Sequence, residues 1–260
     1  MKTALACLAA ASALALMPAA AAPKPKWEVG VGAFATYSPA YWGASRDSDD
    51  FGGFPVVYFI YRGEDISIFS NGLFDVDSNN TERFTFGVSV DGSGGVDSED
   101  RHGLGDIDPV LEIGPKITFA LFATGTQRLE ASLAARVAYQ WGEGFEGWVF
   151  EPSLAYLVSL NDTTRLGFTL VSKFGSEDYN DLWYTDGFYV ADSGYIGSSL
   201  AINLVHDLSD KLRMSAQAKI MTIEGSDMDK FASLVEEDTN YSFRIGFTYS
   251  IWQSSEMARE

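Results

Sequence analysis

Cysteine and histidine are scarce in this chain of 260 residues, which holds one cysteine and two histidines. Cys7 lies in an apolar N-terminal stretch, and a chain without that stretch has no thiol for disulfides or for cysteine-ligated metals. His102 and His206 lie in different regions of the sequence, which argues against a multi-histidine metal site. We therefore predict no metal, no other cofactor and no catalytic residues.

Basic residues are also few, because 18 Lys and Arg stand against 36 Asp and Glu and give a formal net charge of −18. A surface this acidic repels phosphate backbones, so we predict that nucleic acid is not a partner. Acidic side chains cluster in two segments, at 47–50 and at 97–100. The simpler interpretation is solvated loop charge, and the alternative is divalent cations held near lipopolysaccharide.

Long hydrophobic runs are absent beyond the N-terminus. Met1-Lys2 supply a basic start, residues 4–17 are apolar and uncharged, and small residues at 19–22 precede Pro23. This pattern predicts a signal peptide at 1–22, cleaved after Ala21 or Ala22. A lipoprotein is the weaker interpretation, because Cys7 lies near the beginning of the apolar region and not at its end. The rest of the chain is thus either soluble or crosses a membrane as strands.

Apolar residues recur at every second position through most of the remaining sequence, a period that strands keep and helices do not. The clearest run near the C-terminus is Tyr241, Phe243, Ile245, Phe247, Tyr249 and Ile251. The residues between them are small or polar, and in other segments they are charged: Arg136, Arg165, Lys173, Arg213, Lys219 and Arg244. One apolar face and one wettable face predict a transmembrane barrel with a polar interior.

The connections alternate in length, as they do in outer-membrane barrels. Tight polar turns at 124–126, 161–164 and 208–210 contrast with long acidic loops at 91–108, 176–193 and 224–240. The strands are predicted near 27–38, 55–62, 66–75, 83–91, 110–123, 127–140, 147–160, 163–175, 194–207, 211–223 and 240–252. Both ends of such a barrel lie in the periplasm, which requires an even number of strands. We therefore predict an all-β, up-and-down antiparallel barrel of 12 strands, with 10 as the alternative and the counting error before residue 110.

Two further features concern the loops. Aromatic residues near loop boundaries are predicted to form interfacial girdles: Trp141, Trp148, Trp183, Tyr184, Phe188 and Tyr189. Ser226 is a predicted cap of a short helix whose apolar residues continue through Val235. A simple loop helix is the default interpretation, and a plug of the barrel mouth or a partner contact is the alternative.

Catalytic patterns are weak. His206-Asp207 precedes a turn at Ser209, which formally offers the residue types of a hydrolase triad, but adjacency in sequence does not give the required geometry. A polar strand end explains these residues equally well. The glycines at 92–95 and 103–105 have no following helix pattern, so they do not form a nucleotide-binding fingerprint.

Several motifs resemble those of the MltA-interacting protein (MipA/OmpV) family of Gram-negative outer-membrane proteins. The segment Tyr37-Ser38-Pro39-Ala40-Tyr41-Trp42-Gly43 is similar to the family's first loop, and Asn71-Gly72-Leu73 to its next feature. The most specific marker is Gly103-Leu104-Gly105-Asp106-Ile107-Asp108. The family-motif positions are Tyr37, Pro39, Tyr41, Gly43, Gly72, Gly103, Gly105, Asp106 and Asp108.

The resemblance implies a barrel in the outer membrane, surrounded by lipid and lipopolysaccharide, without catalytic residues. It also implies a scaffold that joins a murein transglycosylase to a peptidoglycan synthase. A porin-like channel for small solutes is the alternative, since the basic residues of the inner face would line water and attract anions. The predicted organisation is a signal peptide at 1–22, a barrel at 23–252 and a polar, disordered tail at 253–260.

Overall fold

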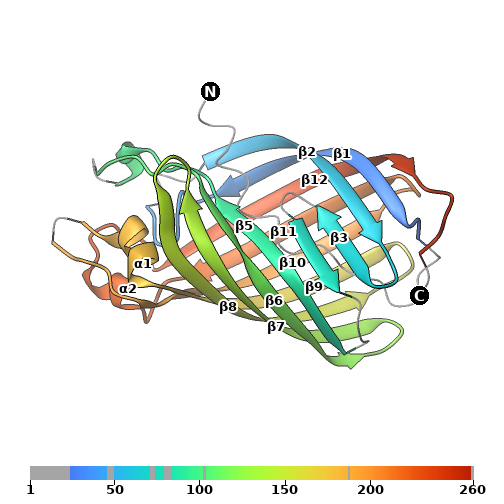
Figure 1. The fold of residues 1–260 in the computed structure, drawn as a ribbon. Helices are drawn as coiled ribbons and strands as arrows, with labels where there is room; N and C mark the ends of the chain where they lie inside the picture. Colours follow the sequence, from blue (N-terminus) through green and yellow to red (C-terminus); the bar gives the residue numbers. More distant parts are fainter. Residues whose placement is uncertain are drawn as a thin grey trace.

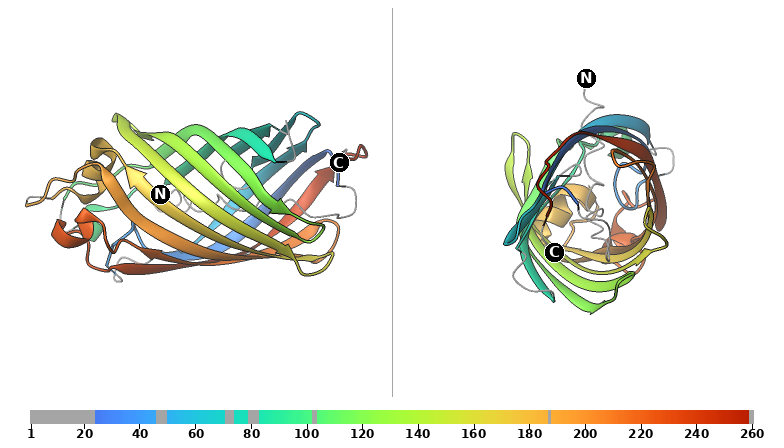
Figure 2. Two further views of the ribbon diagram at one scale, coloured as in Figure 1. Left: turned by 90° about the horizontal axis from the view of Figure 1, so that it is seen from below. Right: turned by 90° about the vertical axis from the view of Figure 1, so that its right-hand side faces the viewer.

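The computed structural model describes residues 24–45, 50–70, 74–78, 83–101, 104–186 and 188–258. These residues form one closed antiparallel barrel in which each strand pairs with its sequence neighbours and the first strand pairs with the last (Figure 1). Seen end-on, the strands form a complete ring (Figure 2). The predicted signal peptide lies outside the described residues.

Twelve strands make up this ring, as predicted. They are β1 (Trp27–Ser38), β2 (Asp50–Arg62), β3 (Ile66–Ser70), β4 (Phe74–Ser78), β5 (Phe84–Ser93), β6 (Val110–Ala123), β7 (Gln127–Gln140), β8 (Gly144–Ser159), β9 (Thr164–Gly175), β10 (Gly194–Asp207), β11 (Leu212–Thr222) and β12 (Thr239–Gln253). The loops contain two short helices, α1 (Glu177–Tyr184) and α2 (Asp227–Phe231), and a 3-10 turn at Ser98–Arg101. Neither α-helix is long and apolar enough to cross a bilayer.

The missing strand lies before residue 110, as expected. The run predicted as one strand at 66–75 is a hairpin, because Ile66 pairs with Ser78 and Ser70 pairs with Phe74 across an antiparallel register. The connecting sequence begins Asn71-Gly72, a strong signal for a tight hairpin turn that the alternating pattern conceals. β2 also begins earlier than predicted, at Asp50.

The β3–β4 hairpin is short, so it covers only part of its neighbours. β3 pairs with β2 only from Phe59 to Arg62. Within the described ranges, residues 50–58 of β2 therefore have no paired strand on the β3 side. Pro55 lies in this stretch, where a residue without an amide hydrogen is tolerated because the edge is unpaired.

The two ends of the barrel differ. The first and last described residues, Lys24 and Ala258, and the tight connections at 63–65, 124–126, 160–163 and 208–211 lie at one rim, whereas α1 and α2 lie at the other (Figure 1). Short turns mark the periplasmic rim of outer-membrane barrels, and longer loops mark the extracellular rim. A cluster of aromatic rings formed by Trp27, Phe59 and Tyr61 lies on the outer face beside the periplasmic rim, with the Trp27 and Tyr61 centroids 4.2 Å apart.

The C-terminal tail differs from the expected disorder. Pro25 and Met257 form an antiparallel bridge, and the Ala258 amide donates to the Lys24 carbonyl oxygen at 2.8 Å. The Lys26 ammonium also pairs with Glu256 at 2.8 Å. The N-terminal segment thus provides a backbone partner, so β12 and the tail extend the closure of the barrel beyond β1.

The alternation of the sequence is confirmed in three dimensions. Leu133 of β7 and Ile202 of β10 are 38% and 43% exposed on the outer face. Asn203, which follows Ile202 in β10, is buried on the lumen face. We predict that Leu133→Arg or Ile202→Arg destabilises the barrel by ~2 to 4 kcal/mol, because the guanidinium would face mid-bilayer lipid. Denaturant titration in lipid vesicles measures this loss.

The control for both substitutions is Asp162→Arg, which places the same side chain in an exposed periplasmic turn. We expect its stability to stay close to that of the unmodified protein. Equal stability of all three variants would contradict the assignment of these faces to lipid.

Candidate functional site

The interior of the barrel contains two clusters of charged side chains at different depths, and the extracellular loops pack over its mouth. The upper cluster lies close to the loops, and each of five consecutive strands contributes one member: Asp91 (β5), Glu112 (β6), Arg136 (β7), Glu151 (β8) and Lys173 (β9). The lower cluster lies at the periplasmic mouth.

Arg136 is the centre of the upper cluster. Its Nε lies 3.1 Å from Glu112 Oε2, one Nη pairs closely with Glu151, and the same Nη lies 3.6 Å from Asp91. Asp91 and Glu112 are direct cross-strand partners, an arrangement that is unfavourable for two like charges without a cation between them. Lys173 adds a second cation, 3.1 Å from Glu112.

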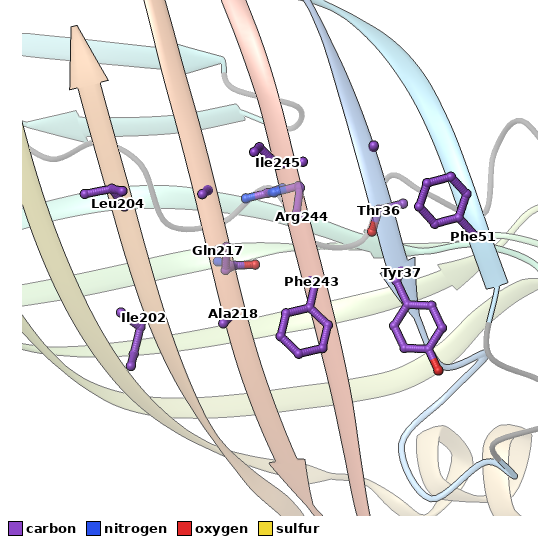
Figure 3. Close-up of a pocket in the computed structure, with 12 residues that line it drawn as sticks. Thr36, Tyr37, Phe51, Ile202, Leu204, Gln217, Ala218, Phe243, Arg244 and Ile245 are labelled. Carbon is purple, nitrogen blue, oxygen red and sulfur yellow. The ribbon is translucent and has the colours of Figure 1, made fainter.

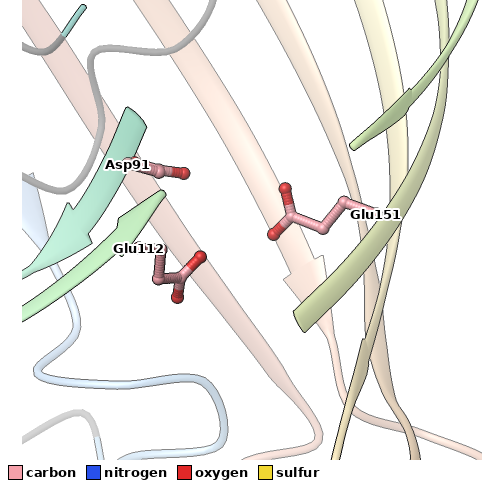
Figure 4. Close-up of side chains that lie close together, drawn as sticks. All are labelled: Asp91, Glu112 and Glu151. Atoms are coloured by element: carbon pink, nitrogen blue, oxygen red, sulfur yellow. The ribbon is translucent and has the colours of Figure 1, made fainter. Parts of the chain in front are cut away.

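The three carboxylates of this cluster, from the nearby strands β5, β6 and β8, point toward one another (Figure 4), with ligand atoms within 4.8 Å of one another. Such a group could in principle hold a cation. Here, however, the space between them is occupied by the guanidinium of Arg136, and Lys173 contacts Glu112 and Glu151. The arrangement is therefore a protein ion-pair network, and the geometry gives no reason to assign a metal to it.

The lower cluster is built around two carboxylates. Asp207 accepts from Arg165 and from its cross-strand partner Arg213, each at 2.7 Å. Glu28 is held by the Tyr58 hydroxyl at 2.9 Å, by the Ser250 hydroxyl at 3.2 Å and by Arg62 at 3.2 Å.

The six basic residues that the sequence placed on the inner face therefore fall into three groups. Arg136 and Lys173 belong to the upper cluster, and Arg165 and Arg213 share Asp207 in the lower one. Lys219 and Arg244 instead lie over aromatic rings, 5.1 Å from the centroid of Trp42 and 5.4 Å from that of Phe34. Most of this charge is thus engaged by the protein itself and does not line an open, water-filled wall.

An apolar loop cluster covers the extracellular mouth, and we call it the loop cap. Its buried members come from four loops and the adjoining strand ends: Tyr41, Ala44, Val96, Ile107, Val110, Ala138, Val149, Tyr179, Trp183, Tyr184, Ala191, Ile196, Ile223, Met228 and Ala232. The packing of the helix at Ser226 favours the predicted plug of the mouth, since Met228 is buried in this cluster and Leu234 is also fully buried, whereas the partner contact stays a prediction. Ser226 caps α2 by accepting from the Asp229 amide at 3.0 Å, as predicted.

Hydrogen bonds join the loops of the cap to one another. Arg101 donates to the carbonyl oxygen of Leu182 at 3.0 Å, and the Tyr41 hydroxyl donates to that of Leu234 at 2.9 Å. Asp186 accepts from the Ser233 hydroxyl at 2.7 Å. Desolvation opposes the ionisation of Asp186, but hydrogen bonds from the Ser233 side chain and from nearby backbone amides outweigh it and lower its pKa to about 2. This contact therefore keeps its charge at any pH well above 2.

Helix α1 was not predicted from the sequence, and it connects the cap to the upper cluster. Its Tyr179 hydroxyl donates to Glu112 at 2.8 Å. The Lys173 ammonium lies over the Tyr179 ring, 4.9 Å from the ring centroid. The helix approaches β8 at Gly147, where φ is +98° and a Cβ atom would lie 2.2 Å from Ser176 Oγ. The sequence signal was Ser176 as a cap followed by two acidic residues in the first turn.

The predicted aromatic girdle is partly wrong, because helix α1 packs two of its residues into the loop cap. Trp141, Trp148 and Phe188 are exposed outside the barrel, but Trp183 and Tyr184 are buried within α1. Proximity to a loop boundary does not distinguish these two positions, because the apolar core of the cap also lies there.

Most described family-motif positions belong to the cap. Gly43 has φ +87°, its amide donates to Asn240 Oδ1 at 2.7 Å, and its carbonyl oxygen accepts from the Glu236 amide at 2.9 Å. In the second loop, the Gly105 carbonyl oxygen accepts from Arg101 at 2.7 Å, and Asp106 accepts from the Ser98 amide at 2.8 Å.

The remaining motif positions are more dispersed. Tyr37 lies on the outer face, 6.4 Å from Phe243 between ring centroids, Pro39 follows the end of β1, and Asp108 is exposed. Gly72, Gly103, His102 and the acidic residues Asp47 and Asp49 lie outside the described residues.

The triad-like residues do not form a triad. His206 Nδ1 lies 2.9 Å from the Thr164 hydroxyl, whereas the adjacent Asp207 forms ion pairs with Arg165 and Arg213. The Ser209 hydroxyl accepts from the amides of its own turn. Because alternate residues of a strand point to opposite faces, Asp207 is not placed to orient His206.

The outer face carries an apolar groove of about 430 Å³. Figure 3 shows its walls, with Ile202 and Leu204 of β10 on one side and Phe243 and Ile245 of β12 on the other. Ala216 and Ala218 of β11 form the floor, so the groove arises where small side chains lie between large ones. It faces the acyl chains of the bilayer and is part of the lipid-facing surface.

Fold and interior together define a closed, twelve-stranded β-barrel of the outer membrane. Residues 31–251 match the family model described as MltA-interacting protein MipA, and the chain belongs to this family. No curated protein sequence matches the chain.

The chain is also similar to several solved structures. They include the NanC porin, with 8% identity and a TM-score of 0.43 over 85% of this chain and 98% of that one. A bacterial polysaccharide outer membrane secretin has 7% identity and a TM-score of 0.45, over 86% and 99% of the two chains. The toluene transporter TbuX of Ralstonia pickettii has 12% identity and a TM-score of 0.38, over 88% and 90%.

The central position of Arg136 leads to a stability prediction. Its side chain is 3% exposed, so Arg136→Leu leaves three neighbouring carboxylates with one remaining cation, Lys173. Breaking a buried ion pair by removing one partner costs about 3 to 5 kcal/mol. We expect this loss of stability in urea unfolding of the protein in detergent micelles, followed by tryptophan fluorescence.

Lys211→Leu is the control, because it removes one positive charge from an exposed periplasmic turn. Its effect should stay within about 0.5 kcal/mol. If Arg136→Leu has an equally small effect, the upper cluster is screened by water and does not hold the strands together.

Proposed function

We propose that the protein is a non-conducting outer-membrane anchor whose periplasmic rim binds murein enzymes. The observation that carries this proposal is the loop cap. Fifteen buried apolar residues from separate loops and strand ends pack against one another over the extracellular mouth. An open diffusion pore needs a continuous water-filled path, and a packed apolar cluster of this kind opposes one.

The interior supports the same proposal. Small barrels are often filled by their own side chains. Here Arg136, Lys173 and Glu112 link neighbouring strands on one side of the lumen, and Tyr179 of the cap is hydrogen-bonded to the same group. Movement of the cap would remove the Tyr179 hydrogen bond from the Glu112 carboxylate. The ion-paired interior therefore stabilises the closed position of the cap.

The identity of the partners rests on the family. The family is described as MltA-interacting, and the resemblance noted in the sequence implies a scaffold that joins a murein transglycosylase to a peptidoglycan synthase. The surface available for such partners is the periplasmic rim, which consists of the tight turns and the paired segments at 24–27 and 254–258. A rim fixed by backbone hydrogen bonds is a preorganised surface, which lowers the entropic cost of association.

The first test is conductance. We expect the purified, refolded protein to give no steady current in planar bilayers beyond that of an empty bilayer, because the cap and the ion-paired interior close the lumen. A general porin inserted under the same conditions is the positive control. Steady and reproducible conductance would instead support the alternative function, a porin-like channel for small solutes.

The second test locates the partner surface. A photo-crosslinking amino acid at Asp162 or Lys211 places the probe in an exposed periplasmic turn, and the same probe at Phe188 places it in an extracellular loop where the side chain is 97% exposed. We expect crosslinks to a murein transglycosylase or a peptidoglycan synthase from the first two positions and not from Phe188. Absence of murein enzymes from the periplasmic adducts would contradict the scaffold function.

A further inference from the structure

The periplasmic mouth is rich in positive charge, although the chain as a whole has a formal net charge of −18. Four basic side chains meet there: Arg62 at the end of β2, Arg165 on β9, Arg213 on β11 and Lys24 in the segment before β1. Among the described residues, two carboxylates, Glu28 and Asp207, form ion pairs with this group. The three arginines alone outnumber the two carboxylates, so the cluster carries a surplus of positive charge, and protonated Lys24 adds one more.

The two carboxylates have few free oxygen positions left to pair with a further cation. Asp207 is shared, with one oxygen 2.7 Å from Arg165 and the other 2.7 Å from Arg213. Glu28 is 5% exposed and is engaged by two hydroxyl groups as well as by Arg62. Neither carboxylate ion-pairs with Lys24 among the described residues.

Two of the cations keep unused hydrogen-bond donors. The Arg165 side chain is 8% exposed, and its buried Nε has no hydrogen-bond partner. The Lys24 ammonium forms no hydrogen bond or ion pair within the described part of the chain, although it lies within electrostatic range of Arg165, Arg213 and Arg62. A buried donor without a partner is unfavourable, and it is commonly satisfied by a bound ion or water.

The cluster is also accessible, because the Arg213 and Asp207 side chains are 29% and 23% exposed. The upper cluster differs in this respect, since its Arg136 and Glu112 side chains are each 3% exposed and are paired with each other. Of the two clusters, only the lower one thus combines an excess of cations, hydrogen-bond donors without partners and contact with water.

We propose that the periplasmic mouth binds a small, doubly charged oxyanion between Lys24, Arg62, Arg165 and Arg213. Guanidinium groups present several donors in a planar fork that matches the oxygens of carboxylates and of tetrahedral anions, and an ammonium adds a point charge. Such an anion would neutralise the surplus charge. The proposal concerns a ligand site in the lumen and does not depend on whether the rim binds murein enzymes.

The protonation of Lys24 adds a pH dependence. Burial and the neighbouring Arg165, Arg213 and Arg62 lower its pKa to about 7, against a weaker opposing effect of Asp207. Lys24 therefore carries its charge below pH 7 and loses it above. Binding of a dianion should strengthen between pH 8 and pH 6. Sulfate is a suitable probe, because it stays doubly charged over this range.

The test is isothermal titration calorimetry of the full-length protein in a zwitterionic detergent, with sodium sulfate in one series and sodium succinate in another, at low and constant ionic strength. We expect one anion to bind per barrel. Lys24→Gln and Arg165→Gln should each weaken binding about tenfold, which corresponds to about 1.4 kcal/mol. Lys211→Gln, which removes an exposed charge from the same rim, should change it less than about twofold.

Two readouts separate a ligand site from a structural role. Lys24 forms no ion pair with another described residue, so Lys24→Gln should fold normally and should abolish the difference in sulfate binding between pH 6 and pH 8. Binding of sulfate alone or of succinate alone supports the proposal and identifies the preferred anion as tetrahedral or as a dicarboxylate. Absence of binding by both, or equal binding by the Lys24→Gln and Lys211→Gln variants, overturns it.

Discussion

The structure depends on one constraint, which is that every backbone amide and carbonyl inside a bilayer must find a partner in the protein itself. Pairing of the first and last strands meets this requirement along their seam, as between β1 and β12 from Glu28–Gln253 to Tyr37–Phe243. Residues 50–58 of β2 are an exception among the described residues, since they have no paired strand on the β3 side. Closure separates two environments, so each strand needs an apolar face toward lipid and another face toward the lumen. The N-terminal segment and the C-terminal tail continue this pairing at the periplasmic rim.

Closure also creates an interior where charges are expensive unless they are paired. The upper cluster meets this requirement by placing Arg136 between three carboxylates, and Tyr179 joins the cluster from the cap above it. The lower cluster pairs fewer of its charges and is more exposed to water. The two ends of the lumen thus differ in chemistry, with a packed and ion-paired extracellular half and a cationic periplasmic mouth. This asymmetry underlies both the anchor function and the anion site that we propose.

Much of the barrel could be predicted from the sequence because a period of two is a local property of a strand. The faces of β7, β10 and β12 and the cap residue of α2 were all predicted from neighbouring residues, whereas the strand number of twelve followed from the requirement for an even number. The hairpin of β3 and β4 was missed because alternation continues across Asn71-Gly72, where turn chemistry overrides the hydrophobic pattern. Trp183 and Tyr184 were misplaced because an aromatic residue at a strand end suits either a membrane interface or a packed loop.

The sequence alone determined the class of protein, the polarity of each strand face, the alternation of short and long connections and the family resemblance, since all of these depend on local patterns. Only the tertiary structure decided which charges meet, because Asp91, Glu112, Glu151 and Arg136 come from four strands and their proximity depends on register and closure. It likewise decided that loops distant in sequence close the extracellular mouth, and that four basic residues from separate segments gather at the periplasmic one. Contacts of this kind are set by the geometry of the ring, which no local pattern in the chain encodes.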